Sequence, residues 1–209
     1  MRTATLTTLL LFQLTVFGQG PRQKKLLDKV LLELRDLKKK NIDSVIYFMP
    51  YFVGDVKSMT ITLTETEEEI RNKECEISDV VFLVWQKRGT TYAKKLNECW
   101  RFKTVMVDSL DFIRQFNKST CKDSTKSYEF IAEDKSIITT GIDHSEVWDL
   151  YANIGNIECT QSIDCFNLLE NKGEDKEVNI NFKYNNELPL IKMLTKLNRQ
   201  LYNIHFEKE

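Results

Sequence analysis

Residues 1–18, MRTATLTTLLLFQLTVFG, have the features of a secretory signal peptide. Arg2 places a positive charge ahead of a short apolar stretch, and Val16 and Gly18 are small enough to precede a cleavage site. The stretch is too short to cross a bilayer, and no later apolar run approaches the required length. The sequence therefore predicts a signal peptide at 1–18 and a single secreted, extracellular domain at 19–209, with no membrane span.

This predicted location constrains the fold through the cysteines, because thiols pair in an oxidising compartment. The chain has five of them: Cys75, Cys99, Cys121, Cys159 and Cys165. Two disulfide bridges and one remaining thiol are expected, and the connectivity stays open. The remaining cysteine either forms an intermolecular bridge, stays as a buried free cysteine, or is left unpaired without a present role.

A glycosylation site is predicted at Asn117. Asn117-Lys118-Ser119 has the pattern of an N-glycosylation acceptor, and it lies among polar residues beside Cys121. We expect a glycosylated surface loop at this position.

Composition excludes two broad classes of protein. Lys and Arg number 30 against 31 for Asp and Glu, so the chain lacks the basic excess of proteins that bind nucleic-acid backbones. A hydrophobic fraction of 42% with 11% aromatic residues excludes a disordered tail. We therefore expect a folded domain with no nucleic-acid partner.

Hydrophobic periodicity predicts a helix near each end of the domain and strands between them. Leucine and valine recur at helical spacing over 22–40, and a second apolar face runs over 187–205. Apolar, β-branched and aromatic runs, several of them alternating, predict strands at 45–53, 59–64, 80–85, 102–107, 128–132, 137–142, 147–151 and 178–184. A short helix opened by Thr160 is expected at 160–169, and a polar turn or loop at 171–177.

This pattern predicts an α+β fold. Some apolar residues of the central region also lie near heptad positions, so an all-α secreted protein is the alternative. Strands are favoured because Thr, Val, Ile and Phe dominate the central runs.

The sequence holds no motif of an enzyme or of a metal or cofactor site. His144 and His205 are the only histidines, and neither has a third metal ligand at a recognised spacing. Glu65 and the three glutamates at 67–69 form an acidic run that we interpret as a solvated loop or a helix start. We expect a non-enzymatic protein with no metal, no cofactor and no catalytic residue.

Aromatic residues on the predicted strands suggest a binding site. Inward-facing aromatics with a few acids can line a closed β-barrel that holds one small ligand. Glu146 and Asp134 are placed to pair with a cationic amine, which nearby aromatic rings also attract. The candidate ligand-binding residues are Tyr47, Trp85, Trp100, Tyr128, Asp134, Glu146 and Trp148.

Two stretches resemble the divergent salivary lipocalins of ticks. The first is the aromatic run Ser44-Val45-Ile46-Tyr47-Phe48-Met49 after the N-terminal helix. The second comprises Glu133-Asp134-Lys135, Glu146-Val147-Trp148, Cys159 and Cys165-Phe166. The resemblance implies an antiparallel β-barrel between an N-terminal and a C-terminal helix, with a small amine or hydrophobic lipid as ligand.

A second, weaker resemblance is to cystatins. A helix, a strand ending near Gly54, an alternating strand and then Cys75 follow a cystatin-like order, which 147–151 and Cys159 echo. This resemblance implies a tandem protease inhibitor. A helical secreted protein that binds an extracellular protein is the third hypothesis. The favoured one is a secreted binding protein that sequesters a small amine or lipid.

Overall fold

The computed structural model describes residues 21–42, 44–53, 62, 64–107, 113, 116–142, 144–171 and 177–209. Several predictions lie outside them wholly or for the most part: the signal peptide at 1–18, the strand at 59–64, Gly54 and the loop at 171–177.

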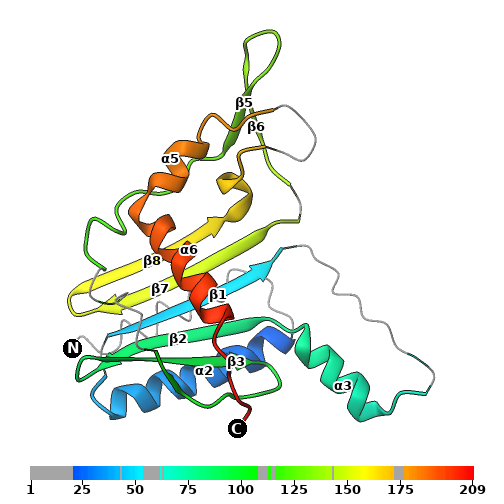
Figure 1. Cartoon of the computed structure of the whole chain (residues 1–209), viewed down its shortest axis with the longest axis vertical. Helices are drawn as coiled ribbons and strands as arrows, with labels where there is room; N and C mark the ends of the chain where they lie inside the picture. Colours follow the sequence, from blue (N-terminus) through cyan, green and yellow to red (C-terminus); the bar gives the residue numbers. More distant parts are fainter. Residues whose placement is uncertain are drawn as a thin grey trace.

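Six antiparallel strands form the main sheet (Figure 1). In spatial order they are β4 (Val105–Met106), β3 (Thr90–Asn97), β2 (Val80–Lys87), β1 (Val45–Phe52), β7 (Glu146–Ile154) and β8 (Ile157–Asp164). A separate hairpin consists of β5 (Tyr128–Ile131) and β6 (Ile137–Thr140). The α+β prediction is therefore confirmed, and the all-α alternative is wrong.

The main sheet is open over the strands that the structure describes. β4 and β8 lie at its opposite edges, and no strand pairing among the described residues joins them. Closure into a barrel needs hydrogen bonds between the first and last strands. The described strands thus do not form the closed barrel that the lipocalin resemblance implies.

Helices cover the two faces of this sheet. α2 (Pro21–Lys39) packs on one face, and α6 (Pro189–Tyr202) packs on the other and crosses the sheet in Figure 1. Both terminal helices were expected. Residues 45–50 of β1 are all buried because successive side chains enter opposite covered faces. Shorter helices among the described residues are α3 (Glu67–Glu76), the 3-10 helix η1 (Cys165–Leu168) and α5 (Phe182–Glu187).

Two tight turns fix the local hairpins of the sheet. Arg88 and Gly89 join β2 to β3 with φ values of 51° and 83°, the pair of positive angles that a type I′ turn requires. Gly155 opens the turn from β7 to β8 with φ of 61°, which glycine adopts without strain.

The C-terminal tail returns to the sheet beside β4. The Lys103 amide donates to the Glu207 carbonyl at 2.8 Å, and the Glu209 amide donates to the Arg101 carbonyl at 2.9 Å. Lys208 Nζ lies 3.3 Å from the centroid of the Trp100 ring. The tail therefore ties the end of α6 to this edge.

Disulfide bonds join Cys75 to Cys99 and Cys121 to Cys159. Cys165 is free and partly buried. The prediction of two bridges and one remaining thiol is confirmed. Burial raises the pKa of the Cys165 thiol, and the nearby Glu146 and Asp164 carboxylates add to the effect.

No helix in the described part of the chain is long and apolar enough to cross a membrane.

The strand predicted at 178–184 is wrong. Val178 makes one isolated bridge with Asn171, and the helix α5 begins four residues later. Buried and exposed side chains do alternate here, but the polar residues are the buried ones: Asn179 is 2% exposed, whereas Val178 is 53% exposed. The Asn179 side chain donates to the carbonyls of Asn167 and Leu169, both at 3.0 Å. Buried amides, and not apolar side chains, thus organise this segment.

Two other predictions need correction, and one strand was not predicted. The helix expected at 160–169 is wrong in its first half, where β8 continues to Asp164, and only η1 is helical. The strand expected at 102–107 shrinks to the two residues of β4. β3 was not predicted, because its sequence is largely polar and lacks an apolar alternation. One of its buried positions is Lys94, whose charge is paired with Glu33.

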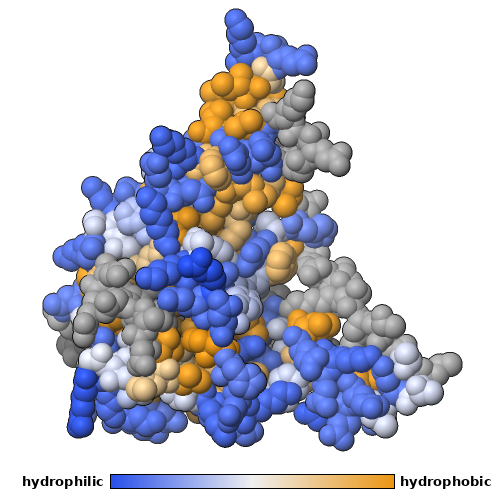
Figure 2. Space-filling view, in the orientation of Figure 1, coloured by the Kyte–Doolittle hydropathy of each residue, from blue (hydrophilic) through white to orange (hydrophobic). Residues whose placement is uncertain are grey.

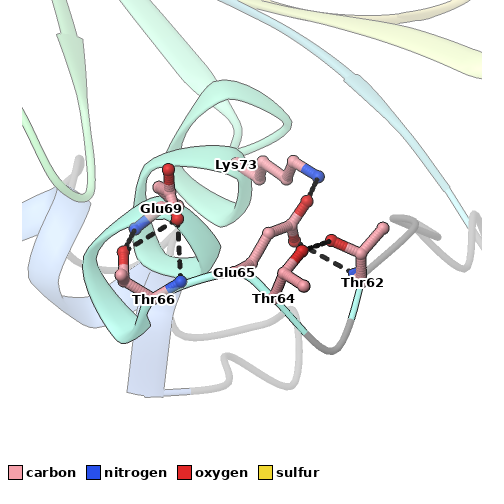
Figure 3. A network of polar contacts seen from close by, with 6 residues as sticks. All are labelled: Thr62, Thr64, Glu65, Thr66, Glu69 and Lys73. Atoms are coloured by element: carbon pink, nitrogen blue, oxygen red, sulfur yellow. Dashed lines mark hydrogen bonds and ion pairs between the residues drawn. The ribbon is translucent and has the colours of Figure 1, made fainter.

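The acidic run is a helix start, as interpreted from the sequence. Thr66 caps α3, and Glu69 closes a capping box by accepting from the Thr66 amide at 2.8 Å (Figure 3). Glu65 forms an ion pair with Lys73 on the same helix. The carboxylates of Glu65 and Glu69 thus stabilise the start of α3.

Candidate functional site

The predicted ligand-binding residues do not form one site. Glu146 and Trp148 belong to the α6 side of the sheet, since Trp148 packs in the core beneath α6. The Trp148 indole Nε1 donates to Glu146 Oε1 at 2.8 Å. Tyr47 and Trp85 belong to the other side, in the core beneath α2. The sheet thus separates the two pairs.

The remaining three predicted residues lie elsewhere. Tyr128 stacks on Phe166 with ring centroids 4.7 Å apart, in a small cluster at the base of the β5–β6 hairpin. Asp134 lies in the exposed turn of that hairpin and accepts from the Ser136 hydroxyl at 2.6 Å. Trp100 lies beneath Lys208 of the tail.

A different group of side chains gathers on the α2 side of the sheet, over β1, β7 and β8. The strand register places Tyr47 opposite Tyr151, and Asp149 opposite both Met49 and Ser162. Residues opposite each other across antiparallel strands share a face. We call Tyr47, Tyr51, Asp149, Tyr151 and Ser162 the tyrosine face.

The tyrosine face centres on Asp149. Its carboxylate accepts hydrogen bonds from the Tyr51 and Ser162 hydroxyls, which lower its pKa. Burial outweighs them and raises the pKa of Asp149 above its ordinary value of 3.8. Burial, the Asp149 charge and the hydrogen bond to it raise the pKa of the Tyr51 phenol. The carboxylate is thus partly withdrawn from water without a cationic side chain among these partners.

Two further tyrosines extend this face. The Tyr151 hydroxyl donates to Glu158 Oε1 at 3.3 Å, and burial followed by the Glu158 charge raises the pKa of Tyr151. The buried Tyr47 donates its hydroxyl to Met49 Sδ at 3.1 Å. Ser162 and Glu158 are exposed, so the face is accessible along β8.

α2 lies over the same side of the sheet, and Tyr47 and Tyr151 belong to the buried cluster beneath it. Lys29 of this helix donates to the carbonyls of Asn97, the last residue of β3, and of Glu98, at 3.1 and 2.6 Å. Lys94 of β3 forms an ion pair with Glu33 of α2 at 2.9 Å. The helix is therefore held to the β3 end, whereas the tyrosine face extends across β7 to β8.

The tyrosine face has the chemistry of a cation site. Carboxylates pair with a positive charge, and tyrosine rings attract cations through their π faces. Both histidines are exposed, and the described residues contain no group of three or more His, Cys, Asp or Glu side chains that could hold a metal ion.

Of the predicted ligand residues, only Tyr47 belongs to the tyrosine face. The sequence does contain a signal for the others: Tyr47, Met49 and Tyr51 alternate, and so do Asp149 and Tyr151. Alternation places each set on one face of its strand, but only the pairing of β1 with β7 shows that the two sets meet.

Comparison of the chain with protein-family models, with curated proteins and with solved structures gave no match.

Proposed function

We propose that the protein is a secreted, non-enzymatic binding protein that sequesters a small cationic amine on the tyrosine face. The observation that carries this proposal is Asp149, a partly buried carboxylate whose hydrogen-bond partners here are the neutral hydroxyls of Tyr51 and Ser162. A protonated amine beside it would offset the cost of desolvating the negative charge.

The surrounding side chains favour an amine over a fatty acid. Tyr51 is only partly buried and offers an aromatic face and a hydroxyl, and Glu158 adds a second, exposed carboxylate beside the hydroxyl of the buried Tyr151. A fatty-acid carboxylate would meet like charges there. The resemblance to tick lipocalins implies a small amine or a lipid and does not decide between them. The tyrosine face lies on the described six-stranded sheet and needs no closed barrel.

The two disulfides support an extracellular location, because such bonds persist in oxidising compartments. Asn117 supports the proposed glycosylation, since it is exposed beside Cys121 and its side chain accepts from the Ser119 amide at 2.9 Å. Digestion of the secreted protein with an N-glycosidase, followed by mass measurement, tests this site. Loss of one glycan from the wild type and none from Asn117→Gln is expected.

Isothermal titration calorimetry with a panel of biogenic amines, and with fatty acids, tests the proposed function. Wild-type protein is expected to bind at least one amine. Asp149→Asn is expected to weaken that binding roughly tenfold or more, because a hydrogen bond or ion pair to a charged group contributes about 1.5–3 kcal/mol.

Asp134→Ala is the matched control, since Asp134 was one of the acids predicted from the sequence and lies in the exposed β5–β6 turn. Alanine is used because an asparagine before Lys135-Ser136 would create an N-glycosylation acceptor. It should bind the amine as the wild type does. Equal losses in both variants, or no amine bound by the wild type, would contradict the proposal.

A further inference from the structure

The β5–β6 hairpin projects from the main sheet and is anchored at its base (Figure 1). The Tyr128 amide donates to Asn167 Oδ1 at 2.8 Å, and the Tyr128 hydroxyl donates to the Glu177 carbonyl at 2.5 Å. Tyr128 is fully buried against Phe166. The hairpin is thus held as a defined projection.

Hydrogen bonds in the turn determine which backbone groups point out of the hairpin. The Lys135 amide donates to the Ala132 carbonyl, and the Ala132 amide donates to the Ser136 carbonyl, both at 2.9 Å. Since bonded and non-bonded pairs alternate in antiparallel strands, Phe130 and Ile138 form the next bonded pair. The backbone groups of Ile137 therefore face outward, and so do those of Thr139.

The two outer edges of the hairpin differ. On β5, the Glu129 carbonyl accepts from the Ile180 amide at 2.8 Å, and the Glu129 amide donates to Asn179 Oδ1 at 3.5 Å. On β6, the outward amides and carbonyls of Ile137 and Thr139 have no hydrogen-bond partner among the described residues. The hairpin thus keeps one open edge.

Nothing in the sequence of β6 protects this edge. Its residues, Ile-Ile-Thr-Thr, are all β-branched, and none is charged or proline, the residues that usually block edge pairing. Ile137 is 62% exposed, and Ile131 opposite it on β5 is 60% exposed. Figure 2 shows the resulting apolar surface on the projecting part of the molecule, below a hydrophilic tip.

We propose that β6 pairs edge to edge with β6 of a second copy of this chain, antiparallel about a two-fold axis at Ile138. Ile137 of each copy then lies opposite Thr139 of the other, and their outward groups form four backbone hydrogen bonds. The strands form a four-stranded sheet in the order β5–β6–β6–β5. The exposed Ile131 and Ile137 of both copies share one face of this sheet.

The chemistry of the edge favours a second copy as the occupant. β6 carries no charge, so two copies bring no like charges together, and the net charge of −1 gives little long-range repulsion. The pairing consumes the open β6 edge of both copies. The outer edge of β5 is already hydrogen-bonded to residues 179–180, so no edge is left for a third copy and the assembly ends at two. The contact is smaller than that of most stable dimers, and we expect dimers at concentrations on the order of 100 µM.

Sedimentation velocity of the full secreted chain from about 5 µM to about 1 mM tests this proposal. The wild type is expected to dimerise. Ile137→Lys, which puts two like charges near each other at the edge, is expected to raise the dissociation constant roughly tenfold or more. Ile131→Lys is the matched control, with nearly equal exposure one strand away from the edge, and should change it far less.

Amide hydrogen exchange in the wild type provides a second measurement that needs no substitution. Protection of the Ile137 and Thr139 amides should rise with concentration, whereas the Ile138 amide, bonded within the hairpin, should not change. A wild type that is monomeric up to about 1 mM would overturn the proposal. So would equal effects of the two lysine variants, or concentration-independent exchange at Ile137 and Thr139.

Discussion

The two sides of the main sheet bury their residues in different ways. Beneath α6 the core is apolar, and Leu194 and Leu197 are 0% exposed. On the α2 side, apolar residues mix with tyrosines and with charged groups such as Lys94 and Asp149. Apolar burial is non-directional, whereas a buried polar group requires particular partners. We infer that the α6 side supplies most of the stability and the α2 side most of the specificity.

Lys94 illustrates the second kind of burial. Its side chain is 9% exposed, and its Nζ lies 2.9 Å from Glu33 on α2 and 2.8 Å from Glu209 in the tail. Burial alone would lower the pKa of Lys94, but the two carboxylates together raise it. One cation thus connects β3, the N-terminal helix and the C-terminal tail.

The largest effect is expected from a cavity on the α6 side. Leu194→Ala should lower the free energy of unfolding by about 2–5 kcal/mol, because no neighbouring group can fill the lost volume without rearrangement. Chemical denaturation measures it. Leu32→Ala, at an exposed position of α2, should change stability by less than about 0.5 kcal/mol. A small effect at Leu194 would mean that the α6 side is not the main source of stability.

An intermediate effect is expected from Lys94→Ala. The change leaves Glu33 unpaired in a mostly buried position, so we expect a loss of about 1–3 kcal/mol in denaturation experiments. Lys103→Ala is the control, because its ion pair with Glu207 at 2.8 Å is exposed. The loss there should be much smaller, because water and salt screen an exposed ion pair. Equal losses would show that burial of Lys94 adds nothing.

A smaller effect is expected from the titration of Asp149. Because burial raises its pKa in the folded state, the folded protein binds this proton more tightly than the unfolded chain does. The resulting stability is complete below pH 3.8, the ordinary pKa, and is lost as pH rises through the raised value. Denaturation midpoints of the wild type should therefore fall, relative to Asp149→Asn, as pH increases from 3.8 toward neutrality. A constant difference between the two proteins would contradict the raised pKa.

The smallest effect is expected from Ser162→Ala. It removes one exposed hydroxyl from Asp149 and should cost about 1 kcal/mol or less. Losing this hydrogen bond should also raise the pKa of Asp149 further, which nuclear magnetic resonance titration of the carboxyl carbon can follow. An unchanged titration would show that the hydroxyl does not act on the carboxylate.

Parts of the fold with regular apolar periodicity could be predicted from the sequence. α2, β1, β2 and α6 each bury a regular set of apolar residues, and they lie where the pattern placed them. β3, β8 and the region before α5 could not be predicted in this way. In β3 and in the segment before α5, inward positions include Lys94 and Asn179, whose polar groups are bonded to other elements of the fold. In β8 the buried positions are Cys159 and Ile163, with three polar residues between them.

The candidate site shows the same limit. The prediction grouped aromatic residues by strand and by nearness to acids, and so it joined Tyr47 with Trp148. A sheet has two faces, and the register decides which residues share one. Tyr47 meets Tyr151, and Trp148 faces the opposite side, because β1 pairs with β7 in this register.

The central place of β1 has a consequence for how the chain folds. The β2–β3 and β7–β8 hairpins close through two-residue turns and can form on a microsecond timescale. β1 must then join both, and its pairing with β7 brings residue 45 to residue 153 across most of the domain. Closing so long a loop slows the search for the native topology. We expect both hairpins to gain amide protection first during refolding, and the insertion of β1 between them to set the overall rate.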